Sequence, residues 1–338
     1  MGHLTPDVAP IRKAMLTGRM RFVVATHGHC FDGLASAVVF TRLAKAAGHD
    51  GAEFSYRTCG YGAGQTRADD SVLTGDQNAI LDYRFTASPK LSWYFDHHRT
   101  AFQNDEDRAI FETRAKSENF FYDPEESSCT KLICDVGERR FGVQSTGLEE
   151  LVRWADTVDA ARFESAAHAV NRSDPVMQLV SVVEHYGDDA MFSELVPELL
   201  SKPLSEVAGS KLVQNRYKPL GKKHERFVER VKQHSEVVGR VVFCDLTESV
   251  LETVGKFVTY ALYPQSVYSV MIGLLKNGPK ISVGYNPWSG QPLDADISAI
   301  CARYGGGGHP VVGAISFTLR ELDKARAIAR SIAAELSS

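Results

Sequence analysis

The sequence predicts an α/β fold in which an N-terminal, doubly wound and mainly parallel sheet is joined by a helical linker to a smaller α/β domain. In the first half, short apolar runs alternate with longer runs at helical spacing, as is typical of parallel sheets with crossover helices. The middle of the chain has only helical spacing, and strand-like runs return after it. We therefore expect boundaries at 1–170, 171–235 and 236–338.

The N-terminal elements are expected in the order helix, strand, helix and four more strands. Residues 1–19 have the pattern of a helical lead-in, 21–26 form an apolar run of strand length, and 34–47 are rich in Ala, Leu and Val at helical spacing. Apolar runs predict the next three strands and Tyr122 starts a fifth, so the remaining strands are placed at 54–57, 79–82, 92–95 and from 122 onward. Crossover segments between strands favour parallel pairing.

Helices follow over most of the next hundred residues. Ser127 or Ser128 is the expected N-cap of a helix over 130–136, because a serine hydroxyl can accept a bond from a helix-start amide. An amphipathic helix is expected over 147–159, and the segment 175–233 combines heptad-like apolar spacing with dense charge. Such charge is usually the solvated face of a helix.

The C-terminal part resumes strand-like sequence. Apolar runs at 266–275 and 280–285 are separated by Asn277-Gly278, which is a strong hairpin signal. Two more strands are expected, at 239–245 and 314–317, and two helices, at 295–304 and 320–336.

Composition excludes several functional classes. The chain has 338 residues, 43% apolar and 24% charged, with a net charge of −4, as in an ordinary globular protein. A broad basic surface for long duplex nucleic acid is not indicated. The six cysteines form no CxxC pair, and no apolar run is long enough to span a bilayer. We expect a cytoplasmic protein that does not bind membranes.

Potential metal ligands gather where predicted strands end. Asp96, His97 and His98 directly follow the run 92–95, and ligands bind at the carboxyl ends of strands in open α/β sheets. Three other stretches place such residues at the same predicted edge: His27, His29, Cys30 and Asp32; Asp82; and Asp156 with Asp159. Any one stretch is compatible with a cap or a surface position, but four together favour a metal site.

The residue types also indicate which metals fit. Histidine and carboxylate together suit Mn²⁺, Fe²⁺, Zn²⁺ or Co²⁺, and oxygen-rich sites shade toward Mg²⁺. Asp82 lies in the middle of the candidate ligands, so we expect it to be shared between two ions. A shared carboxylate holds two metals roughly 3.5–4 Å apart, which suits phosphoryl chemistry.

A glycine run forms the last candidate site. Four consecutive glycines lie between a predicted helix and a predicted strand: Gly305, Gly306, Gly307 and Gly308. Glycine allows close backbone approach, so amides of the run can face an anion. Arg303 and His309 flank it with donors. The alternative, a flexible linker, is disfavoured by the compact elements on both sides.

In this order, the motifs resemble those of the DHH/DHHA1 phosphoesterase family over nearly the whole chain. The resemblance rests on the His27 to Gly33 stretch, Asp82, the Asp96-His97-His98 triplet, Asp156 and the Gly305 to His309 run. It implies a two-domain enzyme with two Mn²⁺ or similar ions in the N-terminal domain and substrate in the cleft. The implied metal ligands are His27, Asp32, Asp82, His97 and Asp156.

The resemblance also implies roles for the other residues. His98 is expected to contact substrate and Asp96 to orient the imidazoles. The implied substrate-phosphate contacts are Arg303, Gly306, Gly307, Gly308 and His309. Cys30 stands where many members have a carboxylate, which leaves open whether His29 or Cys30 binds metal. A thiolate would favour Zn²⁺ or Fe²⁺, whereas a small buried cysteine would not bind metal at all.

The expected function is that of a dinuclear-metal phosphoesterase, with Mn²⁺ as the first choice of ion. It would hydrolyse phosphodiester or phosphomonoester bonds of short oligonucleotides or dinucleotides, as an oligoribonuclease does, through a metal-bridged hydroxide. Exopolyphosphatase or pyrophosphatase activity is the first alternative, and a catalytically impaired nucleotide-binding protein is the second. The family resemblance also suggests a homodimer.

Overall fold

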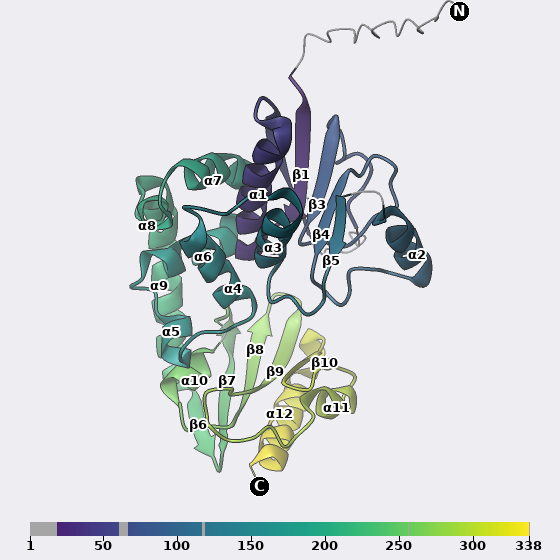
Figure 1. The fold of residues 1–338 in the computed structure, drawn as a ribbon. Helices are drawn as coiled ribbons and strands as arrows, with labels where there is room; N and C mark the ends of the chain where they lie inside the picture. Colours follow the sequence, from purple (N-terminus) through teal and green to yellow (C-terminus); the bar gives the residue numbers. More distant parts are fainter. Residues whose placement is uncertain (1–18, 61–66, 117–118, 256, 338) are drawn as a thin grey trace, which may run out of the picture.

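The computed structural model describes residues 19–60, 67–116, 119–255 and 257–337. They form an α/β structure with a five-stranded parallel sheet and a six-stranded mixed sheet, one above the other in Figure 1. The predicted fold class is therefore confirmed. The predicted N-terminal helix lies, except for Arg19, outside the described residues.

The first sheet has the strand order β2-β1-β3-β4-β5, and every neighbouring pair is parallel. Its strands are β1 (Arg21–His27), β2 (Glu53–Cys59), β3 (Gln77–Leu81), β4 (Trp93–Asp96) and β5 (Asn119–Tyr122). The strand order reverses direction between β1 and β3, which is where open parallel sheets bind ligands. Tyr122 ends the fifth strand, so the prediction that it starts one was wrong.

Helices cover both faces of this sheet, which explains why its strands are apolar throughout. Leu81 packs into a core with α1 (Phe31–Ala44) and α3 (Cys129–Phe141). The preceding Ile80 points to the opposite face and packs toward α2 (Asp105–Arg114). The period of two along a strand thus divides its side chains between two cores.

The middle of the chain is helical, as predicted. Its elements are α4 (Glu149–Asp159), α5 (Ala166–Val170), α6 (Pro175–Tyr186), α7 (Asp189–Ser201), α8 (Leu204–Ala208) and α9 (Lys211–Gln233). In the N-terminal part, a π-helical turn (Lys45–His49) follows α1 directly. Helices α6 and α7 contact α1 and share the core of the first sheet. The extent of a separate linker at 171–235 stays a prediction.

The second sheet has the order β10-β11-β9-β8-β7-β6, and only β7 and β8 run parallel. Its elements are β6 (Ser235–Val238), β7 (Val241–Val250), α10 (Val258–Leu262), β8 (Tyr268–Leu275), β9 (Gly278–Tyr285), α11 (Ile297–Ala302), β10 (Gly307–His309), β11 (Val312–Ser316), a 3₁₀ turn (Leu319–Glu321) and α12 (Leu322–Leu336). Leu275 pairs with Gly278 in an antiparallel hairpin, as the Asn-Gly signal predicted.

The two sheets are connected through α9. Val213 near its start belongs to the first core, whereas Phe227 and Val231 pack against the second sheet. The indole Nε1 of Trp288 also donates to the carbonyl of Phe163 at 2.8 Å. No helix in the described part of the chain is both long and apolar enough to cross a bilayer.

Candidate metal centre

The carboxyl ends of β1, β3 and β4 bring the candidate ligands together. His27 is the last residue of β1, Asp82 directly follows β3, and Asp96 ends β4. Asp82 has a backbone φ of 53°, a conformation that is uncommon outside glycine and that marks functional sites when surrounding structure enforces it. This turn places the Asp82 carboxylate inside the edge of the sheet.

Asp82 is fully buried, and neither carboxylate oxygen has a hydrogen-bond partner among the described residues. Its Oδ2 lies 4.0 Å from His27 Nδ1, and its Oδ1 lies 3.7 Å from His97 Nε2 and 3.6 Å from His98 Nδ1. Burial, followed by the nearby Asp32 carboxylate, raises the pKa of Asp82 to about 7. Two unsatisfied oxygens that face different imidazoles are the arrangement expected of a shared metal ligand.

His97 lies among three carboxylates. Its Nε2 is 3.3 Å from Asp159 Oδ2 and 4.0 Å from Asp32 Oδ2, in addition to its approach to Asp82. Its Nδ1 lies 3.0 Å from the carbonyl of Glu126, which fixes the ring so that Nε2 faces the acids. Burial alone would lower the pKa of His97, but the carboxylates raise it to about 10.

Asp32 is held by the start of another helix. It lies in the first turn of α1, and its two oxygens accept hydrogen bonds from the amides of Cys129 at 2.8 Å and Thr130 at 3.1 Å. These amides belong to the N-terminus of α3, where free N–H groups favour a carboxylate. Asp32 does not cap this helix, because Cys30 holds the N-cap position of α1.

Asp96 orients His98 rather than both imidazoles. Its Oδ1 lies 2.8 Å from His98 Nδ1 and accepts the backbone amide of His97, while its Oδ2 accepts from the Tyr94 hydroxyl. Burial alone would lower the pKa of His98, but Asp96 and Asp82 raise it to about 9. The His98 ring is therefore fixed by Asp96, whereas the His97 ring is fixed by the carbonyl of Glu126.

Three overlapping groups in the described part of the chain could each hold a cation, with ligand atoms within 4.8 Å of one another. They are His27 with Cys30 and Asp82; Asp82 with His97 and His98; and Asp32 with His97 and Asp159. The mixture of imidazole and carboxylate fits Mn²⁺ or a similar ion. Asp82 and His97 each belong to two groups, so the three groups form one connected cluster.

The structure places Asp159 in this cluster and leaves Asp156 outside it. Asp159 is the last residue of α4, whereas Asp156, one turn earlier, accepts from the Ser127 hydroxyl and lies 3.4 Å from Arg162. The two acids are three residues apart on one helix, so sequence spacing did not distinguish them.

The structure also separates His29 from Cys30. His29 has a backbone φ of 56° and an exposed side chain, and its amide donates to the carbonyl of Gly187 at 2.9 Å. Cys30 instead lies with His27 and Asp82. Burial, followed by Asp82 and Asp32, raises the pKa of the Cys30 thiol well above its usual range, so without a bound cation it stays protonated.

The last two glycines of the run, Gly307 and Gly308, lie in the edge strand β10 of the second sheet. A Cβ on Gly306 or Gly308 would lie 2.2 Å from a carbonyl oxygen of β11, so close strand packing explains both glycines. A Cβ on Gly307 would meet nothing within 4 Å among the described residues. Arg303 forms an ion pair with Glu335 at 2.6 Å, and His309 is exposed. None of these residues lines the cavity described next.

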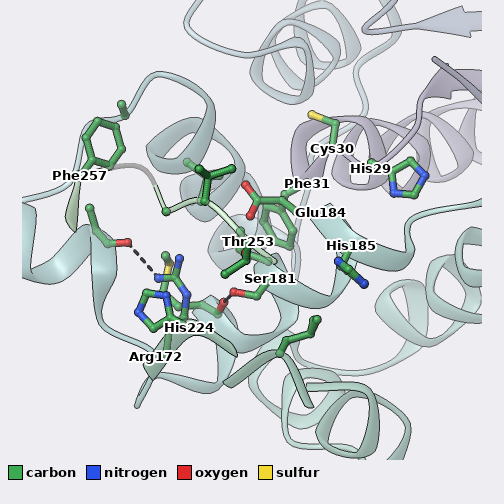
Figure 2. Close-up of a pocket in the computed structure, with 18 of the residues that line it drawn as sticks. His29, Cys30, Phe31, Arg172, Ser181, Glu184, His185, His224, Thr253 and Phe257 are labelled. Carbon is green, nitrogen blue, oxygen red and sulfur yellow. Dashed lines mark hydrogen bonds between the residues drawn. The ribbon is translucent and has the colours of Figure 1, made fainter. Parts of the chain in front are cut away.

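A cavity of about 670 Å³ opens from the metal cluster toward α6 and α9. His27, Asp32, His98 and Asp159 line its inner end. Figure 2 shows His29 and Cys30 on one side of the cavity, Glu184 near its middle, and Arg172 with His224 on the opposite side. Small-molecule sites typically occupy roughly 300–1,000 Å³, so the cavity has room for a nucleotide-sized ligand.

Adding Mn²⁺ to protein treated with a chelator is expected to raise Tm. An ion that binds only the folded state stabilises it by about 2.7 kcal/mol when present at 100 times its Kd. Differential scanning calorimetry with and without Mn²⁺ measures this effect. Asp82→Asn is the control, and an equal Tm increase in that variant would show that the ion binds elsewhere.

Comparison with known proteins identifies solved structures that share this fold. No protein-family model and no curated protein matches the chain. Among solved structures, the pGpG-specific phosphodiesterase PggH from Vibrio cholerae matches with a TM-score of 0.67 and 20% identity, over 93% of this chain and 99% of that one. The DHH domain of a member of a ribosomal-protein family matches with a TM-score of 0.59 and 13% identity, over 94% and 87% of the two chains. The chain has the two-domain DHH/DHHA1 fold.

A third structure with this fold is larger. RecJ from Thermus thermophilus, solved in complex with Mn²⁺, matches with a TM-score of 0.56 and 11% identity over 94% of this chain. The chain covers 52% of that RecJ structure, so it spans about half the length of the exonuclease. Within the DHH/DHHA1 fold, the cluster reported above lies at the carboxyl ends of the first-sheet strands.

Proposed function

We propose that the protein is a metal-dependent phosphodiesterase of the DHH/DHHA1 family that hydrolyses short nucleotide substrates with two divalent ions. The observation that carries this proposal is the buried Asp82, whose two unsatisfied oxygens face separate histidines. The PggH and RecJ likenesses agree with phosphodiester chemistry and with a divalent ion. Mn²⁺ remains the first choice of ion.

The proposed ligands divide into two sets that share Asp82. One set is His27, Cys30 and Asp82, and the other is Asp32, His97 and Asp159 together with the second oxygen of Asp82. Divalent ions held there supply positive charge to the phosphate and lower the pKa of water toward neutrality. Asp159 takes the position that the sequence resemblance assigned to Asp156.

His98 is proposed to contact the substrate phosphate. Asp96 occupies its Nδ1, so the other ring nitrogen is available to donate to an equatorial phosphate oxygen. His98 also lines the cavity, where a substrate would reach it. Gly307, which no close contact explains, and His309 remain proposed contacts from the second sheet, reached if the two sheets close on a ligand.

The cavity volume favours a dinucleotide over pyrophosphate or polyphosphate. We expect the purified protein with Mn²⁺ to cleave a terminally phosphorylated dinucleotide faster than pyrophosphate, polyphosphate or 3′-phosphoadenosine 5′-phosphate. Release of mononucleotide, followed by chromatography, measures the activity. Failure to cleave any of these substrates at full metal occupancy would refute the enzyme proposal and leave the nucleotide-binding alternative. The cytoplasmic location and the homodimer stay predictions.

A further inference from the structure

Backbone strain is concentrated around the metal centre. Four described residues other than glycine have a positive φ: His29, Asp82, Ala161 and Phe257. Asp82 is a proposed ligand, and the other three line the cavity that opens from the metal cluster. Residues with a side chain rarely adopt this conformation, and it persists only where the surrounding structure enforces it. The contacts around Ala161 and Phe257 therefore bear on the site, although neither residue belongs to a sequence motif.

Ala161 lies in the turn that follows the proposed ligand Asp159. Asp159 is the last residue of α4, and Ala161, two residues later, has a φ of 52°. The Ala161 amide donates to the Val158 carbonyl at 3.4 Å, and the Arg162 amide donates to the Thr157 carbonyl at 2.9 Å. These two bonds define a Schellman motif, in which glycine usually occupies the left-handed position. With alanine at this position, the turn needs support from outside the helix.

The second sheet supplies this support through Trp288. The indole Nε1 of Trp288 donates to the carbonyl of Phe163 at 2.8 Å. Phe163 directly follows the two residues that close the turn, and Trp288 lies in the segment between β9 and α11. The hydrogen bond therefore links the second sheet to the backbone that leaves α4, and it restrains the chain at the end of the strained turn.

Trp288 is itself held firmly by the second sheet. Its backbone amide donates to Oδ1 of Asn286 at 3.1 Å. Asn286 is fully buried, and its Nδ2 donates to the carbonyls of Pro264 at 3.2 Å and Ser266 at 2.7 Å. Buried polar groups whose hydrogen bonds are satisfied make the surrounding structure rigid. The Trp288 indole therefore projects from a fixed point and can determine where the Phe163 carbonyl lies.

Aromatic contacts reinforce the same junction. The Phe257 ring lies 5.3 Å from that of Trp288 at an angle of 88°, and 6.5 Å from that of Phe163 at 61°, measured between centroids. Edge-to-face pairs of this kind are a favoured arrangement of aromatic side chains. Phe257 has a φ of 66°, so the junction contains one strained residue on the second-sheet side and one, Ala161, on the α4 side.

The end of α4 matters because Asp159 must lie accurately among the other ligands. Its Oδ2 lies 3.3 Å from His97 Nε2. Asp32, on the other side of that nitrogen, is held by two amides at the start of α3. Asp159 instead comes from the last turn of a helix, where helices commonly fray. A functional site typically tolerates displacements of only roughly 0.5 Å, so the turn after Asp159 bears directly on metal binding.

We propose that Trp288 is a positioning residue, which holds the turn after α4 and thereby places Asp159 for metal binding. The proposal rests on the function proposed above, because it takes Asp159 as a ligand of one of the two ions. It gives the second sheet a part in building the metal site itself, separate from any contact with substrate. A displacement at the junction of Phe163, Phe257 and Trp288 reaches the ion through the backbone of α4.

The test measures the Mn²⁺ affinity of chelator-treated protein by calorimetric titration, which needs no turnover. Trp288→Phe keeps an aromatic ring but removes the N–H donor. We expect it to weaken the binding of one ion by about 3- to 10-fold, the range for the loss of one neutral hydrogen bond. Trp93→Phe is the matched control. The indole nitrogen of Trp93 is also buried but has no hydrogen-bond partner among the described residues, so this variant should bind Mn²⁺ as wild type does.

Ala161→Gly provides a readout that a merely structural role of Trp288 would not change. Glycine adopts the left-handed conformation without steric cost, so the turn then depends less on Trp288. In the double variant Trp288→Phe/Ala161→Gly, we expect the Mn²⁺ affinity to return close to the wild-type value. Wild-type affinity in Trp288→Phe alone would refute the proposal, and so would a loss of affinity that Ala161→Gly does not restore.

Hydrogen exchange of the metal-free protein gives a second readout. In Trp288→Phe, the amides of Ala161 and Arg162, which close the turn, should exchange faster than in wild type, while those of α3 should not. Unchanged exchange at these two amides would refute the role of Trp288 in holding the turn. Absence of phosphodiesterase activity in the wild type would instead refute the function proposed above, and it would alter neither of these measurements. Circular dichroism and Tm verify that the variants are folded.

Discussion

Asp82→Asn is expected to abolish metal binding and hydrolysis together. Asp82 belongs to two of the three candidate ligand groups and is the ligand that both proposed ions share, so its loss removes a ligand from each of them. Loss of a residue that merely supports a ligand typically costs about 10–100-fold in metal affinity or activity. Because Asp82 is proposed to bind the ions directly, we expect kcat/KM to fall by at least ~1,000-fold. Steady-state kinetics measures kcat/KM, and atomic emission measures the metal content of the variant. Wild-type metal content in the variant would refute the assignment.

The same variant is expected to stabilise the metal-free protein. The pKa of Asp82, about 7 in the fold, lies above the ~3.9 of an exposed aspartate, so its ionised form destabilises the folded state. This cost appears as the pH rises from about 4 to 7 and is constant above that range. Asparagine removes the charge. At neutral pH we expect Tm to rise by a few degrees, because about 1 kcal/mol corresponds to ~2–4 °C in a large domain.

Calorimetry of chelator-treated protein checks this second effect. The Tm difference between wild type and variant should shrink at pH 4, where Asp82 is largely protonated in the folded state and about half protonated in the unfolded state. A higher Tm of the metal-free variant together with a loss of activity would show that the protein retains the buried Asp82 charge in order to bind metal ions. A lower Tm for Asp82→Asn at pH 7 would contradict this account of the carboxylate.

Asp159→Ala is expected to be far more damaging than Asp156→Ala. Asp159 lies 3.3 Å from His97 Nε2, while Asp156 binds the Ser127 hydroxyl and Arg162. We expect Asp159→Ala to lower metal affinity and kcat/KM by at least ~100-fold, and Asp156→Ala by no more than ~10-fold. Equilibrium dialysis with Mn²⁺ and steady-state kinetics measure both. A greater loss of metal affinity and kcat/KM in Asp156→Ala than in Asp159→Ala would show that Asp156 is the metal ligand, as the sequence resemblance implied.

Much of the fold could be predicted from the sequence because it is locally encoded. The strand over 79–82 and the Asn277-Gly278 hairpin are recognisable within a few residues, and both occur in the structure with small shifts at their ends. The expectation that acids and imidazoles gather at one sheet edge followed from parallel topology alone. His27, Asp82 and His97 accordingly lie together.

The rest of the site depends on geometry that no local pattern encodes. His29 and Cys30 are adjacent, and the left-handed backbone at His29 leaves its side chain exposed while that of Cys30 lies beside Asp82. Asp156 and Asp159 differ by their place relative to the end of α4. The cavity itself is enclosed by residues of helices that lie far apart in the sequence and belong to no motif.

Helix α9 has a mechanical consequence for this cavity. Its 23 residues span about 35 Å, with Val213 embedded in one core and Phe227 in the other. The helix is therefore anchored in a core at each end, and the two sheets cannot separate without bending it. Pro219 lies between the two anchored ends, and because proline lacks the amide hydrogen for a helical hydrogen bond, the helix bends most easily there. Any closure of the second sheet onto the metal cluster is thus restricted to a flexing motion about the middle of α9.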